Sequence, residues 1–178
     1  MIGDNTNNTK TSYSSDGTAW QEYNKPSQTD AVWPNNGYMK AVAFNSNIYV
    51  YGGQNNSGSV SQEIYRSGDG ENWTKESDGA FTASTKHRMV VVGGTLYMVV
   101  VGASAGNSVW KSGDGTTWVQ VTDNGGFTAR QGHQVAALGN YMYLVGGSDG
   151  QPDGTVYKDV WRSSDGAVWR QGYAGTFR

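Results

Sequence analysis

Few side chains in this sequence could act in acid–base, nucleophilic or metal chemistry. The 178 residues include only two histidines, His87 and His133, and no cysteine. Without cysteine there is no thiolate nucleophile, no thiolate metal site and no disulfide framework. The sequence also lacks an HExxH motif, a nucleophile elbow and a phosphate-binding loop. We therefore expect no catalytic residues, no bound metal and no cofactor.

Arginine side chains could still bind an anionic substrate. A sialidase-like site needs an arginine triad around one pocket, together with a Tyr/Glu nucleophile pair. Here Arg66 and Arg162 stand beside a repeated turn and Arg178 is terminal, which is not typical of such a triad. A fragment of a glycoside-active enzyme, with its other catalytic residues elsewhere, remains the alternative to a non-catalytic protein.

A repeated segment organises the chain. SSDGTAW at residues 14–20 returns as SGDGENW, SGDGTTW and SSDGAVW, and its Asp recurs after 53, 45 and 51 residues. The four aspartates are Asp16, Asp69, Asp114 and Asp165. Because the motif recurs in every repeat, we expect each Asp to cap its own turn and the Trp that follows to pack between repeats.

Each complete repeat reads as four short strands. The first two are nearly continuous apolar runs, as expected for a sheet covered on both faces, and the fourth is polar after its Trp. We expect the Asp-Gly pair between the third and fourth strands to form a type I′ turn. The expected strands are 38–44, 48–51, 62–67 and 73–76; 87–92, 96–101, 108–112 and 118–121; 133–138, 141–145, 158–163 and 169–173.

These motifs resemble those of the kelch family. The Gly pairs at 52–53 and 146–147, the tyrosines Tyr49 and Tyr143, and the Trp of the fourth strand stand where kelch repeats have them. The segments 130–133 and 161–169 are similar to bacterial kelch-like propellers, and the Ser-x-Asp-Gly-x-x-Trp turn is similar to the Asp-box of sialidase-type propellers. The resemblance implies an all-β propeller of four-stranded antiparallel blades. It implies little about function, since propellers serve as lectins, enzymes and adaptors.

The repeats predict about three and a half blades in one propeller domain. We expect a flexible N-terminus at 1–10, a half blade with its connecting loop at 11–37, and blades at 38–86, 87–131 and 132–178. Known propellers close with four to eight blades. The chain is therefore expected to assemble with copies of itself into a larger ring, to be part of a larger propeller, or to close as a strained ring of its own. An engineered or evolutionary-intermediate propeller piece without a ligand is a further alternative.

The longer loops of the repeat carry the candidate ligand-binding residues. Strand alternation places the loops after the second and fourth strands, including 102–107 and 148–157, on one face. Their amides, carboxylates and aromatic rings could hydrogen-bond to and stack on sugars, or form a polar protein-binding rim. Arg130 and Arg88 are expected mainly to bridge groups or to be solvated, and the two histidines to be structural. The candidates are Trp33, Asn35, Asn55, Asn56, Arg130, Gln131, Asp149, Gln151 and Asp153.

Composition limits the partners. The formal net charge is −2 at pH 7, which provides no broad basic surface for nucleic acid or an anionic membrane. The longest apolar stretch, 89–103, is shorter than a spanning helix and contains a Gly-Gly-Thr interruption. We expect a soluble module that binds a protein or glycan and associates with copies of itself. Its low charge and Asn-, Ser- and Thr-rich surface favour an extracellular or bacterial cell-surface location.

Overall fold

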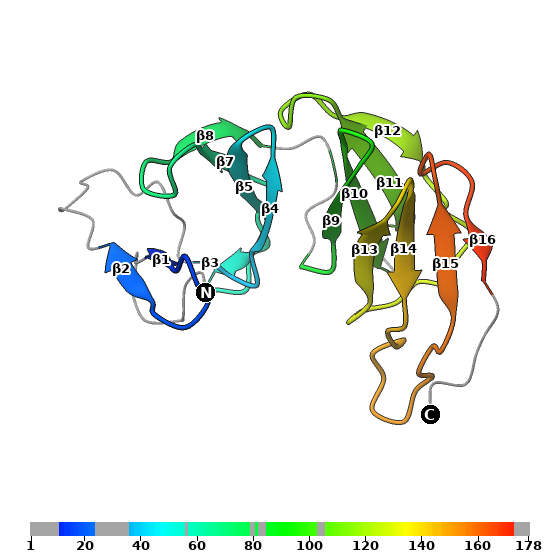
Figure 1. Ribbon diagram of the computed structural model, residues 1–178. Helices are drawn as coiled ribbons and strands as arrows, with labels where there is room; N and C mark the ends of the chain where they lie inside the picture. Colours follow the sequence, from blue (N-terminus) through cyan, green and yellow to red (C-terminus); the bar gives the residue numbers. More distant parts are fainter. Residues whose placement is uncertain are drawn as a thin grey trace. The chain divides into compact units, whose positions relative to one another are not determined.

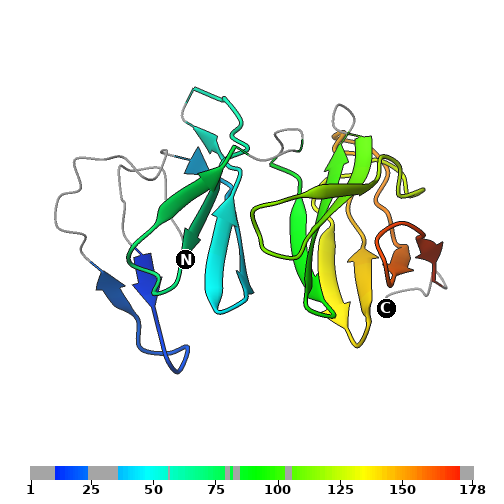
Figure 2. The same ribbon diagram turned by 90° about the horizontal axis from the view of Figure 1, so that it is seen from above.

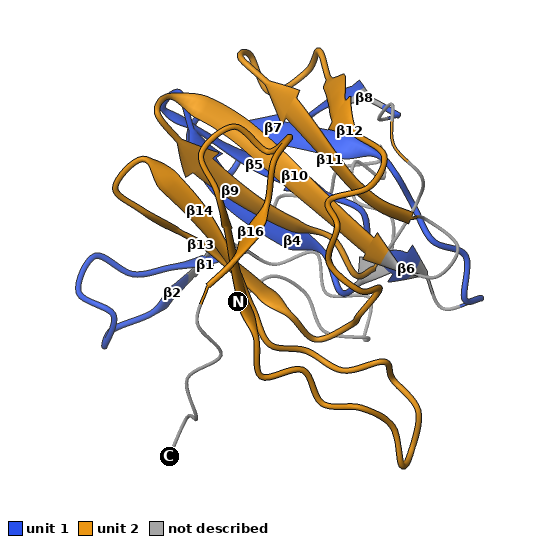
Figure 3. Cartoon of the chain, turned by 90° about the vertical axis from the view of Figure 1, so that its right-hand side faces the viewer, with its two compact units in different colours: residues 1–79 blue, residues 80–178 orange. Residues whose placement is uncertain are grey.

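The computed structural model describes residues 11–23, 36–55, 57–78, 81, 85–102 and 106–172. The chain divides into two compact units, residues 1–79 and 80–178 (Figure 3). Every element of the described residues is a β-strand, and no helix there is long and apolar enough to cross a membrane.

The described residues of unit 1 form one four-stranded sheet and two small sheets (Figure 1). The four-stranded sheet has the order β4-β5-β7-β8, formed by Lys40–Phe44, Asn47–Tyr51, Ile64–Ser67 and Thr74–Ser77. The hairpin β1–β2 pairs Thr11–Tyr13 with Gln21–Tyr23, and β3 pairs with β6, Asn36–Gly37 with Gln54–Asn55.

Unit 2 contains two sheets of the same design (Figure 2). The first comprises β9 to β12, formed by Arg88–Val92, Thr95–Gly102, Gly106–Ser112 and Val119–Thr122. The second comprises β13 to β16, formed by Gln134–Leu138, Tyr141–Val145, Val160–Ser163 and Arg170–Gln171. All neighbours are antiparallel, and the first strands of the two sheets, β9 and β13, lie side by side (Figure 1). The predicted all-β fold of four-stranded antiparallel sheets is confirmed.

The two sheets of unit 2 pack face to face through apolar side chains. β9 to β11 contribute a row of valines, among them Val99 and Val109, together with Tyr97. The second sheet contributes Met142 and Leu144, and Trp169 completes the cluster. Alternate residues of a strand point to the same side of its sheet, which explains why every second residue of these apolar strands belongs to the cluster. Trp169 therefore packs between two repeats.

Two expectations about connections are wrong. The Asp of the Ser-x-Asp-Gly turns does not adopt positive φ; only the Gly does, for example Gly70 at 79° and Gly166 at 78°, so these are not type I′ turns. Positive φ at both central residues occurs instead in the turn between β4 and β5, at Asn45 and Ser46 (47° and 57°). The loop expected at 102–107 is also shorter, because β10 and β11 pair as far as Gly102 and Gly106.

Candidate binding site

The repeated turns are fixed by their own Ser and Asp side chains. In the last turn, Oδ1 of Asp165 accepts hydrogen bonds from the backbone N–H groups of Ala167 at 2.9 Å and Val168 at 3.1 Å. Ser163 donates its hydroxyl to the same carboxylate and accepts the N–H of Gly166 at 2.9 Å. The same pattern occurs around Asp16, Asp69 and Asp114.

These hydrogen bonds favour the ionised carboxylate. Backbone N–H donors lower the pKa of each turn Asp below its ordinary value. Oδ1 of each carboxylate is thus already bound by its own loop. Asp16, Asp69, Asp114 and Asp165 act in these turns as structural caps.

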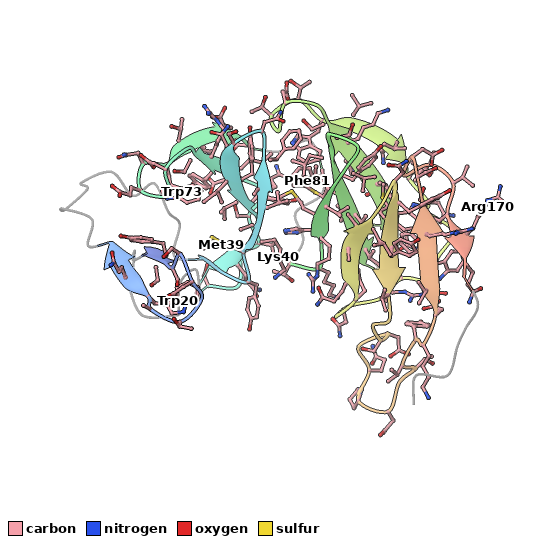
Figure 4. The ribbon with its side chains drawn as sticks, in the orientation of Figure 1. Trp20, Met39, Lys40, Trp73, Phe81 and Arg170 are labelled. Carbon is pink, nitrogen blue, oxygen red and sulfur yellow. The ribbon has the colours of Figure 1, made fainter. Side chains whose placement is uncertain are left out.

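The turn tryptophans differ in their surroundings. Trp73 and Trp169 are buried, at 7% and 8% exposure, and each donates Nε1–H to the carbonyl of the turn Gly. Trp118 meets Phe81 edge to face with ring centroids 5.9 Å apart. Trp20 lies in the N-terminal hairpin (Figure 4) and is 57% exposed.

In unit 2, two loops beyond the sheet ends are joined into one surface, which we call the loop surface: residues 128–133 and 146–159. Gln131 and Ser148 exchange both backbone hydrogen bonds, at 2.8 and 2.9 Å. Ser148 also forms an isolated bridge with Val156. The two loops therefore hold each other in place as a small extension of the sheet.

Arg130 lies beneath this surface. Its side chain has 0% exposure and pairs with Asp159, with Nη2 donating to Oδ2 at 2.9 Å. It also donates to the carbonyls of Thr128 and Gly146, both at 3.0 Å, and stacks 4.2 Å from the ring of Tyr157. Arg130 thus bridges the two loops, and its guanidinium is paired with Asp159 and does not face solvent. The sequence placed Arg130 among the ligand-binding candidates, whereas the structure gives it a role inside the loop surface.

The other candidates of unit 2 occupy the outer part of the loop surface. Asp149 accepts the N–H groups of Gln151 at 3.0 Å and Thr155 at 2.9 Å, which lowers its pKa. Gln151 and Asp153 are exposed at the tip of the same loop, and Gln131 is half-buried beside it. The structure therefore brings Gln131, Asp149, Gln151 and Asp153 together on one loop pair.

The candidates of unit 1 are less fully described. Trp33, Asn35 and Asn56 lie outside the described residues. The backbone of Asn55 pairs with Asn36 in the β3–β6 ladder. This ladder stands where Gln131 pairs with Ser148 in unit 2, so the same loop-to-loop link occurs in both units.

His133 and His87 stand directly before β13 and β9 of unit 2 and are buried, at 0% and 1% exposure. Burial, followed by the nearby charges of Arg88, Arg130 and His87, lowers the pKa of His133 to about 3. Neither ring nitrogen of His133 has a hydrogen-bond partner among the described residues. His133 is thus neutral at pH 7 and is not placed for acid–base work on a ligand.

One repeated feature was missed from the sequence. In the third strand of each four-stranded sheet, an aromatic side chain donates a hydrogen bond to the polar side chain two residues earlier. The pairs are Tyr65 with Glu63 at 3.1 Å, Trp110 with Ser108 at 3.2 Å and Trp161 with Asp159 at 2.7 Å. The sequence signal was available, since an acidic residue or Ser stands two positions before an aromatic residue in each repeat.

Within the described part of the chain, no group of three or more His, Cys, Asp or Glu could hold a metal ion. The outer part of the site consists of amide and carboxylate groups on a sheet scaffold. Such a surface can bind a polar ligand by hydrogen bonding.

The repeated sheets, their Asp-capped turns and the inter-sheet Trp define a β-propeller of the kelch class. Comparisons with known proteins support this. A model of the DUF6242 beta propeller domain matches residues 15–138, and a Kelch motif matches residues 129–162. The chain belongs to the DUF6242 beta propeller domain family.

Among solved structures, 151 chains match. The structure titled "Structure of YjhT" superposes with a TM-score of 0.63 at 14% identity, covering 80% of this chain and 53% of that one. At this identity the likeness concerns the fold alone, and this chain spans about half the length of that structure. No curated protein matches.

Proposed function

We propose that the chain is a non-catalytic kelch-like propeller module that binds a protein or glycan through the loop surface and assembles with copies of itself into a larger ring. The observation that carries the binding proposal is the linkage of the two loops. Backbone pairing of Gln131 with Ser148 and the buried Arg130–Asp159 ion pair hold the loops before any ligand arrives. A preorganised surface loses less entropy when it binds.

The exposed groups on this surface suit a polar ligand. Gln151 offers an amide, Asp153 a carboxylate and Val156, at 66% exposure, an apolar contact. Asp149 contributes indirectly by holding the loop that carries them. The composition of the chain supports an extracellular or cell-surface setting for such recognition.

The proposal that copies of the chain form a larger ring is supported by the length of this chain relative to a solved structure of the same fold. The chain covers 53% of a solved structure with which it shares its fold. A sheet at the end of an open stack also leaves an apolar face in water, which a further sheet would cover. Two copies in one ring would have a mass of about twice the 19.2 kDa of one chain.

A glycan array and a peptide display screen with the purified chain test the binding role. A ligand found there should bind the Gln151→Ala/Asp153→Ala variant about tenfold or more weakly, because hot-spot contacts are worth at least about 1.4 kcal/mol. Gln171→Ala, an exposed change on the edge strand β16, serves as the matched control and should bind normally.

Two results would contradict the proposal. Equal affinity of the loop variant and the control would remove the loop surface from the binding site. Turnover of an arrayed glycoside by the purified chain would favour the enzyme-fragment alternative.

A further inference from the structure

Within unit 2, an Asp-capped turn of one sheet seats on the face of the next. A Cβ atom added at Gly166 would lie 3.0 Å from Cγ1 of Val109 and 3.2 Å from Cδ1 of Tyr97. Trp169 ends the same turn and is 8% exposed in the apolar cluster that these residues share. The turn at 163–169 therefore fits against a surface formed by β10 and β11.

The N-terminal hairpin carries the same turn without such a surface. Asp16 accepts the N–H groups of Thr18 and Ala19 at 2.8 and 2.9 Å, so the turn has the shape of the one at Asp165. A Cβ atom at Gly17 would meet no atom within 4 Å, and Trp20 is 57% exposed. The exposed indole of a preformed turn is thus open to a partner.

The β13–β16 sheet carries the matching face. Strand register makes Tyr143, Val145 and Val160 equivalent to Tyr97, Val99 and Val109 of the preceding sheet. The latter three are buried, at 8%, 0% and 0% exposure, because the next sheet covers them. Tyr143, Val145 and Val160 are only half-buried.

The edge of the same face is open. Leu138 is 72% exposed, whereas its equivalent Val92 is 6% exposed. Tyr141 is 39% exposed and lies under the guanidinium of Arg162, 5.2 Å from the ring centroid. This face therefore repeats a surface that accepts a turn, but no turn of the described residues lies on it.

We infer that two copies join head to tail, with the turn 14–20 of one copy seated on the β13–β16 face of the other. A second copy is the occupant because every chain carries both halves of a contact that unit 2 already makes internally. In this contact Gly17 and Trp20 take the places of Gly166 and Trp169, and Asp16 approaches the side that carries Arg162. Such a heterologous contact closes into a ring or extends as a chain. The inference rests on the proposed self-assembly and names the surfaces that perform it.

Paired cysteines test the contact directly, since the chain has no Cys of its own. Gly17→Cys chains are mixed with Val160→Cys chains under mild oxidation, and a disulfide between two chains is expected on a non-reducing gel. The Gly166→Cys/Val109→Cys variant is the matched control, because its two positions meet within one chain and Gly166 has nearly the φ of Gly17, 78° against 76°. Gly17→Cys mixed with Val119→Cys, whose position is exposed on β12, should give no cross-link.

A second variant avoids the strain of a side chain at positive φ. Trp20→Ser should weaken self-association at least about tenfold by sedimentation, as expected for loss of an aromatic anchor. Val119→Ser should leave self-association unchanged. Equal association of the Trp20→Ser and Val119→Ser chains would overturn the contact.

The outcomes separate the contact from the ring proposal. Assembled wild-type protein that gives no Gly17–Val160 cross-link would refute this contact while self-assembly stands. A monomeric wild-type protein would refute both. A cross-link that forms only within a single chain carrying both cysteines would show that the turn seats on its own chain and would also overturn the inference.

Discussion

The Arg130–Asp159 pair offers the sharpest test of how the loop surface is built. Arg130 is the buried partner, with a side chain at 0% exposure against 15% for Asp159. Asp159→Ala leaves a guanidinium buried without its counter-charge, which costs about 3–5 kcal/mol. Arg130→Met fills the same volume and leaves a carboxylate that still accepts Nε1–H of Trp161 at 2.7 Å. We therefore expect Asp159→Ala to destabilise the protein more than Arg130→Met.

A double-mutant cycle in urea measures this difference. Because each variant removes the same pair, Arg130→Met/Asp159→Ala should cost less than the sum of the two single changes, by about 1–3 kcal/mol. Lys75→Met is the control at an exposed ion pair, since Lys75 binds Glu63 at 2.8 Å and Asp78 at 2.7 Å while 45% exposed. An exposed pair contributes about 0–1 kcal/mol. Strict additivity of the cycle, or an Asp159→Ala cost no larger than that of Lys75→Met, would refute the structural account of this pair.

Three further perturbations test other parts of the structure. Gly147→Ala should cost about 3 kcal/mol or more by urea denaturation, because the new Cβ would lie 2.8 Å from the carbonyl O of Gln131 at φ 99°. Gly139→Ala, at φ 58° with open space around it, should cost only about 1–2 kcal/mol, and equal losses would contradict the packing of Gly147. His133 has a folded-state pKa of about 3 against about 6.5 unfolded, so its contribution is fully present above pH 6.5 and is lost as the pH falls toward 3. Unfolding free energies at pH 7.5 and 5 should therefore differ less in His133→Asn than in the wild type, and an unchanged difference would contradict a buried neutral ring. Asp165→Ala removes two backbone hydrogen bonds and should cost about 1–2 kcal/mol; a melting temperature unchanged from wild type would show that the carboxylate does not hold the turn.

Sequence periodicity was sufficient to predict the four-stranded sheets. The strands expected at 141–145 and 87–92 correspond to β14 at Tyr141–Val145 and β9 at Arg88–Val92. Long apolar runs separated by glycine and polar turns leave little choice of register, because a slip of one residue would expose the buried face. The repeated motif then fixed the number and order of strands in each sheet.

The turn type was harder to predict because Asp-Gly is compatible with two structures. A two-residue type I′ turn needs positive φ at Asp as well as Gly. In this chain the Asp carboxylate instead accepts the backbone N–H groups two and three residues after it, and only the Gly has positive φ. The Ser two residues before the Asp is the feature that favours this longer, side-chain-capped turn.

The loop surface was predicted in part. Loop position and polarity pointed to Gln131, Asp149, Gln151 and Asp153, which the structure brings together. Arg130 could not be separated from them by sequence, because its burial depends on Asp159, a residue 29 positions away. The exposure of Trp20 was equally hidden, since its motif is the same as that of the buried Trp169.

Light scattering coupled to size-exclusion chromatography tests the central claim most directly, that blade-like sheets of this chain are completed by those of another copy. The account predicts that the wild-type protein has a mass that is a multiple of 19.2 kDa, about twice that value for a two-copy ring. The mass of the Trp20→Ser variant should fall toward that of one chain on dilution. A wild-type mass of one chain at all concentrations would contradict it.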